Sequence, residues 1–280
     1  KSSSNPTLTQ NNSCYSLEGA EYGIYSDAAC KTLVGTLKTD ATGKSNTVEL
    51  TKGTYYVKET KSPKGFALDT RVKTVTVASS QTTTLNVTDI AQLDPVDIAL
   101  GKVDKETNAN KPEGSASLAG AEFTIKYYSE QMSTDPALQG KQATRTWVIR
   151  TDENGRARLS ERYKVSGDDF YRDSSNNISL PLGTITIQET KAPEGYLINS
   201  EVYVRRVTAN GDLEAVETYN MPTIKEEAVK GDIQITKFAQ DIDGEVERKV
   251  PLEGIIFKLT SKTTGKSWTI TTDKNGYAST

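Results

Sequence analysis

Residues 183–196 read GTITIQETKAPEGY, and residues 53–66 repeat this stretch as GTYYVKETKSPKGF. In both copies apolar and polar residues alternate, which is typical of a strand whose successive side chains point to opposite faces. The alternation places Glu189 on the face of two isoleucines, and it places Glu59 on the corresponding face of the earlier copy. A carboxylate aimed into an apolar core is costly unless it is protonated or partnered. Each of these acids therefore needs a partner from elsewhere in the chain.

The composition is that of a globular, strand-rich chain. Its 280 residues are 35% hydrophobic and 25% charged, a length that predicts two or three domains. A net charge of −3 without a basic block gives no footprint for nucleic acid or an anionic membrane. The chain has no histidine and only two cysteines, so we expect no metal and no cofactor. No apolar run approaches the length of a membrane span.

Internal repeats show that one unit is written nearly three times. A Leu-x-Gly strand opening occurs at residues 17–22, 118–123 and 252–257. A Thr-Asp-x-x-Gly turn follows at residues 39–43, 151–155 and 272–276, and such turns tolerate the positive φ of a hairpin. The Glu-Thr-Lys stretch follows in the first two copies only.

The repeats predict domains at residues 1–92 and 93–222, followed by a linker and a truncated third copy at 223–280. The chain begins and stops abruptly within the repeat pattern, so we read it as a piece of a longer protein. Copy two carries polar inserts at residues 129–143 and 161–178, where we expect any surface specific to that unit.

A lysine shares a face with aliphatic residues in the opening strand of copies two and three, at Lys102 and Lys237. Lys1 takes the same place in copy one because Lys1 and Lys102 both stand sixteen residues before the leucine of the next strand. In the last strand, alternation turns Asp89 of copy one and Asn220 of copy two toward the core. Each complete copy thus offers a core-facing lysine, glutamate and aspartate or asparagine.

The presence of an amine, a carboxylic acid and an Asn or Asp side chain in one core predicts a reaction between them. An amine buried among aliphatic side chains loses its charge readily and becomes a nucleophile, whereas a buried carboxylic acid holds its proton. Such a proton can polarise the Asn or Asp carbonyl and then serve the leaving group. Held together by a fold, the amine and the carbonyl would react to a side-chain amide with loss of ammonia or water.

The three motifs together resemble the Cna B-type, SpaA-like domains of Gram-positive pilins and surface adhesins, and the resemblance covers essentially the whole chain. It implies an all-β fold of tandem small Greek-key sandwiches, prealbumin-like or Ig-like, two complete and one truncated. It also implies autocatalytic isopeptide bonds assisted by a glutamate. By position these are Lys1–Asp89 with Glu59 and Lys102–Asn220 with Glu189, while Lys237 would await a partner beyond Thr280. Copy one departs from many members by carrying Asp in place of Asn and by lacking the strand setting of its lysine.

Several other interpretations remain open at this point. The lysine and acid sets could be ordinary buried salt bridges, although two sets in matching register and a third lysine disfavour this. Cys14 and Cys30 could form a disulfide, which an oxidising surface setting favours, or remain two thiols. Residues 241–245 could suggest calcium, but a hairpin turn fits them better. Glu59 with Asp89, or Glu189 with Asp212, could form a glycosidase pair, which nothing else in the sequence supports.

The resemblance predicts an extracellular, cell-wall attached stalk or pilin segment that is not an enzyme beyond one intramolecular reaction per unit. Its expected partners are the neighbouring domains of its own chain and, in an assembled fibre, sortase-linked pilin subunits. The alternative is an adhesin module that binds a host or matrix ligand through the inserts of copy two. No nucleic acid and no membrane contact are expected for this piece.

Overall fold

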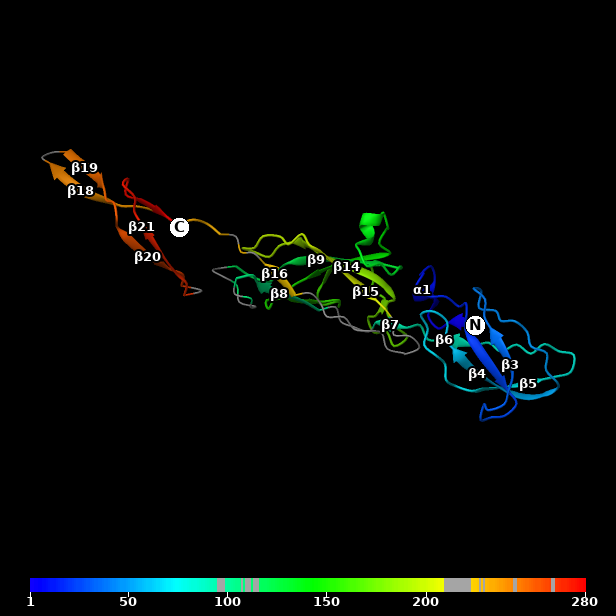
Figure 1. The fold of residues 1–280 in the computed structure, drawn as a ribbon. Coiled ribbons are helices and arrows are strands. Elements are labelled where there is room, and N and C mark those ends of the chain that lie inside the picture. The colour runs from blue at the N-terminus through cyan, green and yellow to red at the C-terminus, as the bar shows by residue number, and fades with distance from the viewer. Residues whose placement is uncertain are drawn as a thin grey trace.

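The computed structural model describes residues 1–280 except 95–98, 107, 109–111, 113–115, 209–222, 227, 229, 244–245 and 263–264. Three groups of strands follow one another in chain order along an elongated molecule (Figure 1). We call strands β1–β6 the first unit, β8–β16 the second unit and β17–β22 the third unit. The prediction of an all-β fold with tandem prealbumin-like domains is confirmed.

The first unit contains a four-stranded antiparallel sheet in the order β3-β2-β4-β5 and a parallel pair formed by β1 and β6. Its elements are β1 (Ser2–Ser3), α1 (Pro6–Thr9), β2 (Glu21–Tyr25), β3 (Leu33–Lys38), β4 (Gly53–Lys61), β5 (Lys73–Val77) and β6 (Thr88–Asp89). The alternation in β4 turns Tyr55, Val57 and Glu59 into the core, where Tyr22 and Ile24 of β2 meet the two apolar side chains. The predicted face of Glu59 is therefore confirmed.

The second unit contains a five-stranded sheet in the order β12-β10-β9-β14-β15 and a three-stranded sheet in the order β11-β8-β16. Its first elements are β8 (Ala99–Asp104), β9 (Glu122–Tyr128), the 3₁₀ helix η1 (Pro136–Gln139), β10 (Arg145–Arg150) and β11 (Arg156–Arg158). Its later elements are β12 (Lys164–Gly167), β13 (Leu180–Pro181), β14 (Gly183–Lys191), β15 (Val202–Val207) and β16 (Thr223–Glu226). Strand β16 extends this unit beyond the boundary predicted at residue 222.

Both faces of strand β14 are covered. Ile185, Ile187 and Glu189 are buried on the core side, as predicted, but Thr184 and Thr186 are buried as well. The start of the insert at residues 129–143 lies over this outer face, since the Thr184 hydroxyl donates to the carbonyl of Glu130 at 2.7 Å and accepts from the amide of Met132 at 2.8 Å. The insert is therefore partly a cover for the sheet.

The first two units are joined by a packed junction. Strand β7 (Leu93–Asp94) follows the first unit and pairs with β13 of the second. The Tyr15 hydroxyl donates to the carbonyl of Gln92 at 2.6 Å and accepts from the amide of Leu182 at 2.9 Å. Asn12 reinforces this contact by donating to the Tyr127 hydroxyl at 2.8 Å. Side chains of both units belong to one apolar cluster, so the junction is a continuation of the core.

The third unit contains three antiparallel strand pairs: β17 with β22, β18 with β19, and β20 with β21. The strands are β17 (Gln234–Thr236), β18 (Phe238–Asp243), β19 (Val246–Pro251), β20 (Ile256–Thr260), β21 (Ser267–Thr271) and β22 (Tyr277–Ser279). Large apolar side chains such as Ile256 and Trp268 are exposed in this unit. It contains the opening strands of the repeat.

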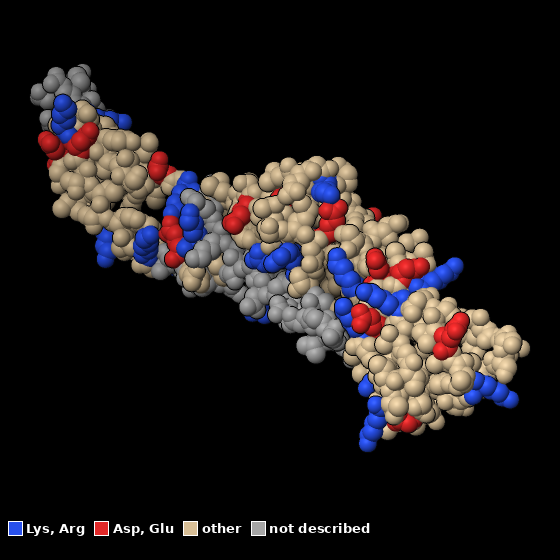
Figure 2. Space-filling view, turned by 45° about the vertical axis from the view of Figure 1, so that its right-hand side comes forward, with Lys and Arg blue, Asp and Glu red and all other residues tan. Residues whose placement is uncertain are grey.

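Basic and acidic side chains are interspersed along the whole length of the face shown in Figure 2, in keeping with the small net charge. Within the part of the chain that the structure describes, no helix is long and apolar enough to cross a membrane.

Candidate functional site

The turn of each unit holds the backbone of its opening lysine. In all three units the lysine backbone nitrogen donates to the carbonyl of the turn glycine, and the lysine carbonyl packs against that glycine. The three bonds run from Lys1 to Gly43 (2.7 Å), from Lys102 to Gly155 (2.9 Å) and from Lys237 to Gly276 (2.7 Å). Each glycine has a positive φ, and a Cβ there would meet the lysine carbonyl at 3.2 Å or less. The structure thus confirms that the three lysines occupy equivalent places.

A buried threonine begins each of these turns and closes it onto the Leu-x-Gly strand. Its hydroxyl donates to the leucine carbonyl and accepts an amide of the strand that follows. The donating bonds measure 2.5 Å from Thr39 to Leu17, 2.8 Å from Thr151 to Leu118 and 2.6 Å from Thr272 to Leu252. The Thr-Asp-x-x-Gly motif therefore positions the lysine in addition to making a hairpin.

In the first unit, Glu59 of β4 lies directly against Lys1. Both side chains are buried, and Oε1 of Glu59 forms an ion pair and hydrogen bond with Nζ of Lys1. Oε2 of Glu59 faces the other way and accepts the backbone N–H of Asp69 at 2.7 Å. The backbone donor fixes the carboxyl group so that Oε1 alone is turned toward the lysine.

The second unit repeats this geometry. Oε1 of Glu189 contacts Nζ of Lys102, both groups are buried, and Oε2 of Glu189 accepts the N–H of Asn199 at 2.7 Å. The predicted pairing of a core lysine with a core glutamate is therefore present in both complete units.

Asp89 brings the third group to the first unit. Strand β6 runs parallel to β1, with Ser3 opposite Asp89, and the buried Asp89 carboxylate forms an ion pair with Nζ of Lys1. Burial raises the pKa of the Asp89 carboxyl to about 6, and the neighbouring Lys1 ammonium opposes part of that rise. Lys1, Glu59 and Asp89 thus meet in one buried cluster, as predicted from the alternation of their strands.

In the first two units an aromatic residue of the Leu-x-Gly strand covers the lysine. Nζ of Lys1 lies 4.8 Å from the ring centroid of Tyr22 and donates to its hydroxyl, whereas Nζ of Lys102 lies 5.0 Å from the ring of Phe123. Burial raises the pKa of the Tyr22 hydroxyl, and the nearby Glu59 acts in the same direction. The first unit therefore has a hydroxyl beside its lysine that the second unit lacks.

The remaining predicted site residues are Asn220, Asp212 and Lys237, and none of them is seen in a buried cluster in the described part of the chain. Asn220 and Asp212 lie outside the described residues. Lys237 follows β17 and its side chain is exposed in the third unit. Its backbone makes the same hydrogen bond to the turn glycine as in the other units. Among the described residues, no counterpart of Glu59 or Asp89 contacts its side chain.

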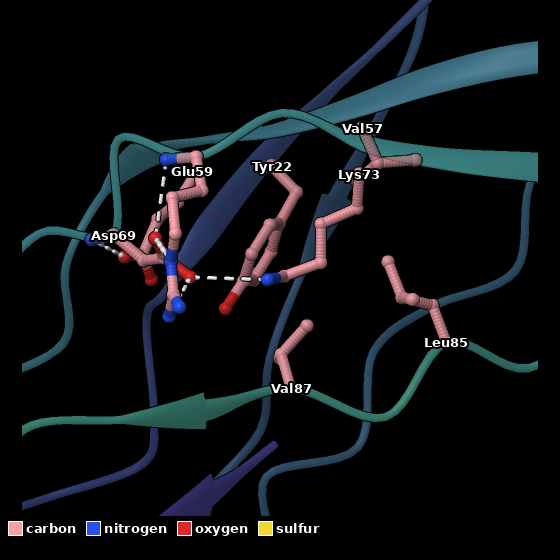
Figure 3. A pocket seen from close by; sticks show the side chains of 8 residues that line it. Tyr22, Val57, Glu59, Asp69, Lys73, Leu85 and Val87 are labelled. Atoms are coloured by element: carbon pink, nitrogen blue, oxygen red, sulfur yellow. Dashed lines mark hydrogen bonds and ion pairs between the residues drawn. The ribbon is translucent and has the colours of Figure 1, made fainter.

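Figure 3 shows the outer side of the first cluster, a hollow between β4, the segment after it and the irregular segment before Asp89. Tyr22, Glu59 and Val87 line it, and Lys73 forms an ion pair with Asp69 at 3.3 Å at its rim. The hollow is too narrow to admit a water molecule, and Glu59 and Asp89 are each only 2% exposed. A sugar cannot reach these two acids in the folded unit, which argues against the glycosidase pair.

Of the two alternatives for Cys14 and Cys30, the structure contains two free thiols and no disulfide between them. They lie toward opposite ends of β2. Cys14 is buried near Ser129 of the second unit, whereas Cys30 follows the far end of β2 in the turn before β3. Burial raises the pKa of the Cys14 thiol to about 11.

Metal ligands are not grouped in the described part of the chain, where no cluster of three His, Cys, Asp or Glu side chains occurs. The segment considered for calcium forms the hairpin of β18 and β19, with Asp243 opposite Val246. Residues 244–245 lie outside the described residues.

The sequence interpretation missed two parts of the site. These are the backbone donors of Asp69 and Asn199 and the aromatic cover of Tyr22 and Phe123. A signal for the donors was present, because Asp69 and Asn199 both stand four residues after the glycine of the Glu-Thr-Lys stretch. The side chain of each also accepts the amide two residues later, a local turn that orients the donor.

Comparison with known proteins agrees with this architecture. A family model described as the SpaA prealbumin-like fold domain matches residues 8–91 and 97–222. No curated protein sequence matches the chain.

Among solved structures, the Bacillus anthracis TIE protein is similar at 26% identity with a TM-score of 0.58, covering 95% of this chain and 40% of that one. A C-terminal fragment of the pilus adhesin SpaC from Lactobacillus rhamnosus GG is 19% identical, with a TM-score of 0.41 and coverages of 88% and 92%. BcpA, the major pilin subunit of Bacillus cereus, is 16% identical, with a TM-score of 0.29 and coverages of 94% and 80%. The last two similarities are too distant to carry an argument.

Proposed function

Because the chain belongs to the SpaA prealbumin-like fold domain family, we propose that it is a stalk or pilin segment of a Gram-positive cell-surface protein. Its units would be locked by intramolecular isopeptide bonds, and its neighbours would be further domains or sortase-linked subunits of a wall-attached fibre. The chain spans 40% of the length of the similar Bacillus anthracis protein, so the role of the whole protein is part of this proposal.

The observation that carries the proposal is the contact of Nζ of Lys1 with both Glu59 and Asp89 in a buried cluster. A structural salt bridge needs one acid for one lysine. Two acids on one buried amine leave a net negative charge in the core, which is expensive to keep. Amide formation between Lys1 and Asp89 would remove both of their charges and release the desolvation cost that the pair bears.

Glu59 is placed to carry the proton. Its Oε2 accepts the Asp69 N–H, so a proton taken from the Lys1 ammonium resides on Oε1, beside the reacting atoms. The neutral amine then attacks Cγ of the Asp89 carboxylate, and one of the amine's own protons passes to the departing oxygen. The proton returns from Glu59 to the leaving hydroxyl.

The reaction balances without a further reactant. The ammonium of Lys1 and the carboxylate of Asp89 become an amide and one water, and Glu59 ends in its starting state. Proximity in the folded unit supplies the effective concentration that amide formation lacks in solution. The reaction occurs once per unit, so no turnover of an external substrate is proposed.

The value of the bond is mechanical. Strands β1 and β6 are the first and last strands of the first unit in sequence, and they pair side by side in parallel. Strand β7, which follows β6, pairs with β13 of the second unit. A bond between Lys1 and Asp89 would carry tension from the second unit past the hydrogen bonds of the sheet. It would also restrict the unfolded chain as a long-loop cross-link does, by about 4 to 5 kcal/mol on the loop-entropy model.

The Lys102–Glu189 pair supports a second bond by the same chemistry. The alternation of the sequence predicts Asn220 as its partner, with loss of ammonia in place of water.

Intact mass of the folded chain tests the proposal. A bond in the first unit removes one water, and Lys1→Ala abolishes that loss while the control Lys31→Ala, in the exposed turn after β2, keeps it. A native chain whose mass equals that of the unmodified sequence after complete folding would overturn the proposal.

One observation favours the adhesin alternative. The insert after β9 projects the helix η1 away from the second unit, and Leu138 at its tip is 84% exposed. In the adhesin alternative, this exposed apolar tip would contact the host or matrix ligand. Adhesion to extracellular matrix that persists after Leu138→Ser and after removal of η1 would rule out this surface.

A further inference from the structure

We propose that the residue joined to Lys102 is Glu226 and not Asn220, so that the second unit loses water as the first does. This inference rests on the proposed function, because it names the partner within the same bond. It follows from backbone register, which the alternation of a single strand cannot reveal.

The first comparison uses the residues that lie opposite each other in the parallel strand pairs, β1 with β6 and β8 with β16. In the first unit Asp89 lies opposite Ser3, the residue two positions after Lys1. In the second unit Glu226 lies opposite Asp104, the residue two positions after Lys102. Counted from the lysine, Asp89 and Glu226 occupy the same position of the neighbouring parallel strand.

An isolated bridge on the other side of each strand gives an independent register. The aromatic residue that ends the Glu-Thr-Lys stretch pairs with an alanine in both units: Phe66 with Ala91, and Tyr196 with Ala228. Ala91 stands two residues after Asp89, and Ala228 stands two residues after Glu226. Both measures therefore select Glu226, six residues beyond Asn220.

The step is the one described for the first unit. Nζ of Lys102 gives a proton to Oε1 of Glu189 and attacks Cδ of Glu226 as a neutral amine. The C–O bond to the hydroxyl breaks, Glu189 returns the proton, and water leaves. The ammonium and the carboxylate become one amide and one water.

High-resolution intact mass of the full chain separates the alternatives. We expect the loss of two waters. The loss of one water and one ammonia would overturn this inference and leave the proposed function standing, because Asn220 would then be the partner. The loss of one water alone would deny the second unit any bond, and no loss would overturn the proposed function itself.

Trypsin digestion of the native chain locates the bond without any variant. Cleavage after Arg206 and Lys225 puts Asn220 in the peptide 207–225 and Glu226 in the peptide 226–230. We expect the peptide containing Lys102 to be joined to 226–230, with fragmentation placing the bond on Glu226. A link to 207–225 would overturn the inference.

Two matched variants complete the test. Asn220→Ala should keep both water losses, and Glu226→Ala should lose one of them. Glu226→Gln should still react, now with loss of ammonia, and should reach the same final mass as the native chain because the amide formed is the same. Retention of both water losses in Glu226→Ala would contradict the assignment.

Discussion

The side chain of Lys1 lies against the carboxylate of Asp89, although the two residues stand at opposite ends of the first unit. Strands β1 and β6 bring them together as parallel neighbours, and Glu59 contacts the same amine from β4. Three strands that are far apart in sequence thus converge on one buried nitrogen. The chemistry of the unit depends on this convergence.

Glu59→Gln tests the proton carrier. Glutamine keeps the size of the side chain but cannot take the lysine proton, so we expect the water loss of the first unit to disappear. The free energy of unfolding of this unit should fall by about 4 to 5 kcal/mol, the loop-entropy contribution of the missing bond. Intact mass and thermal melting measure the two effects.

The matched control is Glu21→Gln. Glu21 is partly exposed, and its ion pairs with Lys38 and Lys61 are long, at 3.9 Å each, so mass and melting temperature should stay native. Bond formation in Glu59→Gln at the native rate would show that Glu59 carries no proton.

Stability of the unbonded first unit should depend on pH through Asp89. Burial, which Glu59→Gln leaves in place, raises the pKa of the Asp89 carboxyl above its ordinary value, so the group stabilises the fold below pH 4 and loses that contribution as pH rises toward 6. We expect the melting temperature of Glu59→Gln to fall between pH 4 and pH 6 for this reason.

The bonded native chain provides the comparison, because its Asp89 carboxyl has become an amide and no longer titrates. Asp69, whose pKa the Arg71 side chain lowers to about 2, acts in the opposite sense and only below pH 4. An equal fall in the native chain between pH 4 and pH 6 would assign the effect to another group.

Tyr15→Phe tests the junction between the first two units. The change removes a hydroxyl that receives the Leu182 amide and donates to the Gln92 carbonyl, at a cost of about 1 to 3 kcal/mol for buried groups left unpaired. Hydrogen exchange at the Leu182 amide should therefore become roughly ten- to hundredfold faster. Tyr56→Phe, on β4 of the first unit, is the control and should leave that amide unchanged.

The two thiols should react very differently with an alkylating reagent. Cys14 is buried at the junction, and its pKa of about 11 leaves little thiolate at pH 8. Cys30, half-buried in a turn, should be labelled in the native chain, while Cys14 should be labelled only after denaturation. Mass mapping of the labelled peptides decides this, and resistance of both thiols before reduction would restore the disulfide.

The sequence by itself determined which residues face the core. Alternation with a period of two placed Glu59 and Glu189 among apolar side chains, and the repeated spacing placed Lys1, Lys102 and Lys237 in equivalent positions. These conclusions need only the local geometry of a strand, in which each residue fixes the face of the next.

Only the tertiary structure decided how strands remote in sequence are aligned. Alternation gives the face of a residue on the last strand but not its register against β8, and the backbone pairing places Glu226 opposite Asp104, the observation behind the proposed partner of Lys102. The amides that hold the two glutamates and the docking of Tyr15 on the second unit likewise arise from contacts between distant segments. Register between such segments is set by long-range hydrogen bonding and by the length of the connections, neither of which a local pattern encodes.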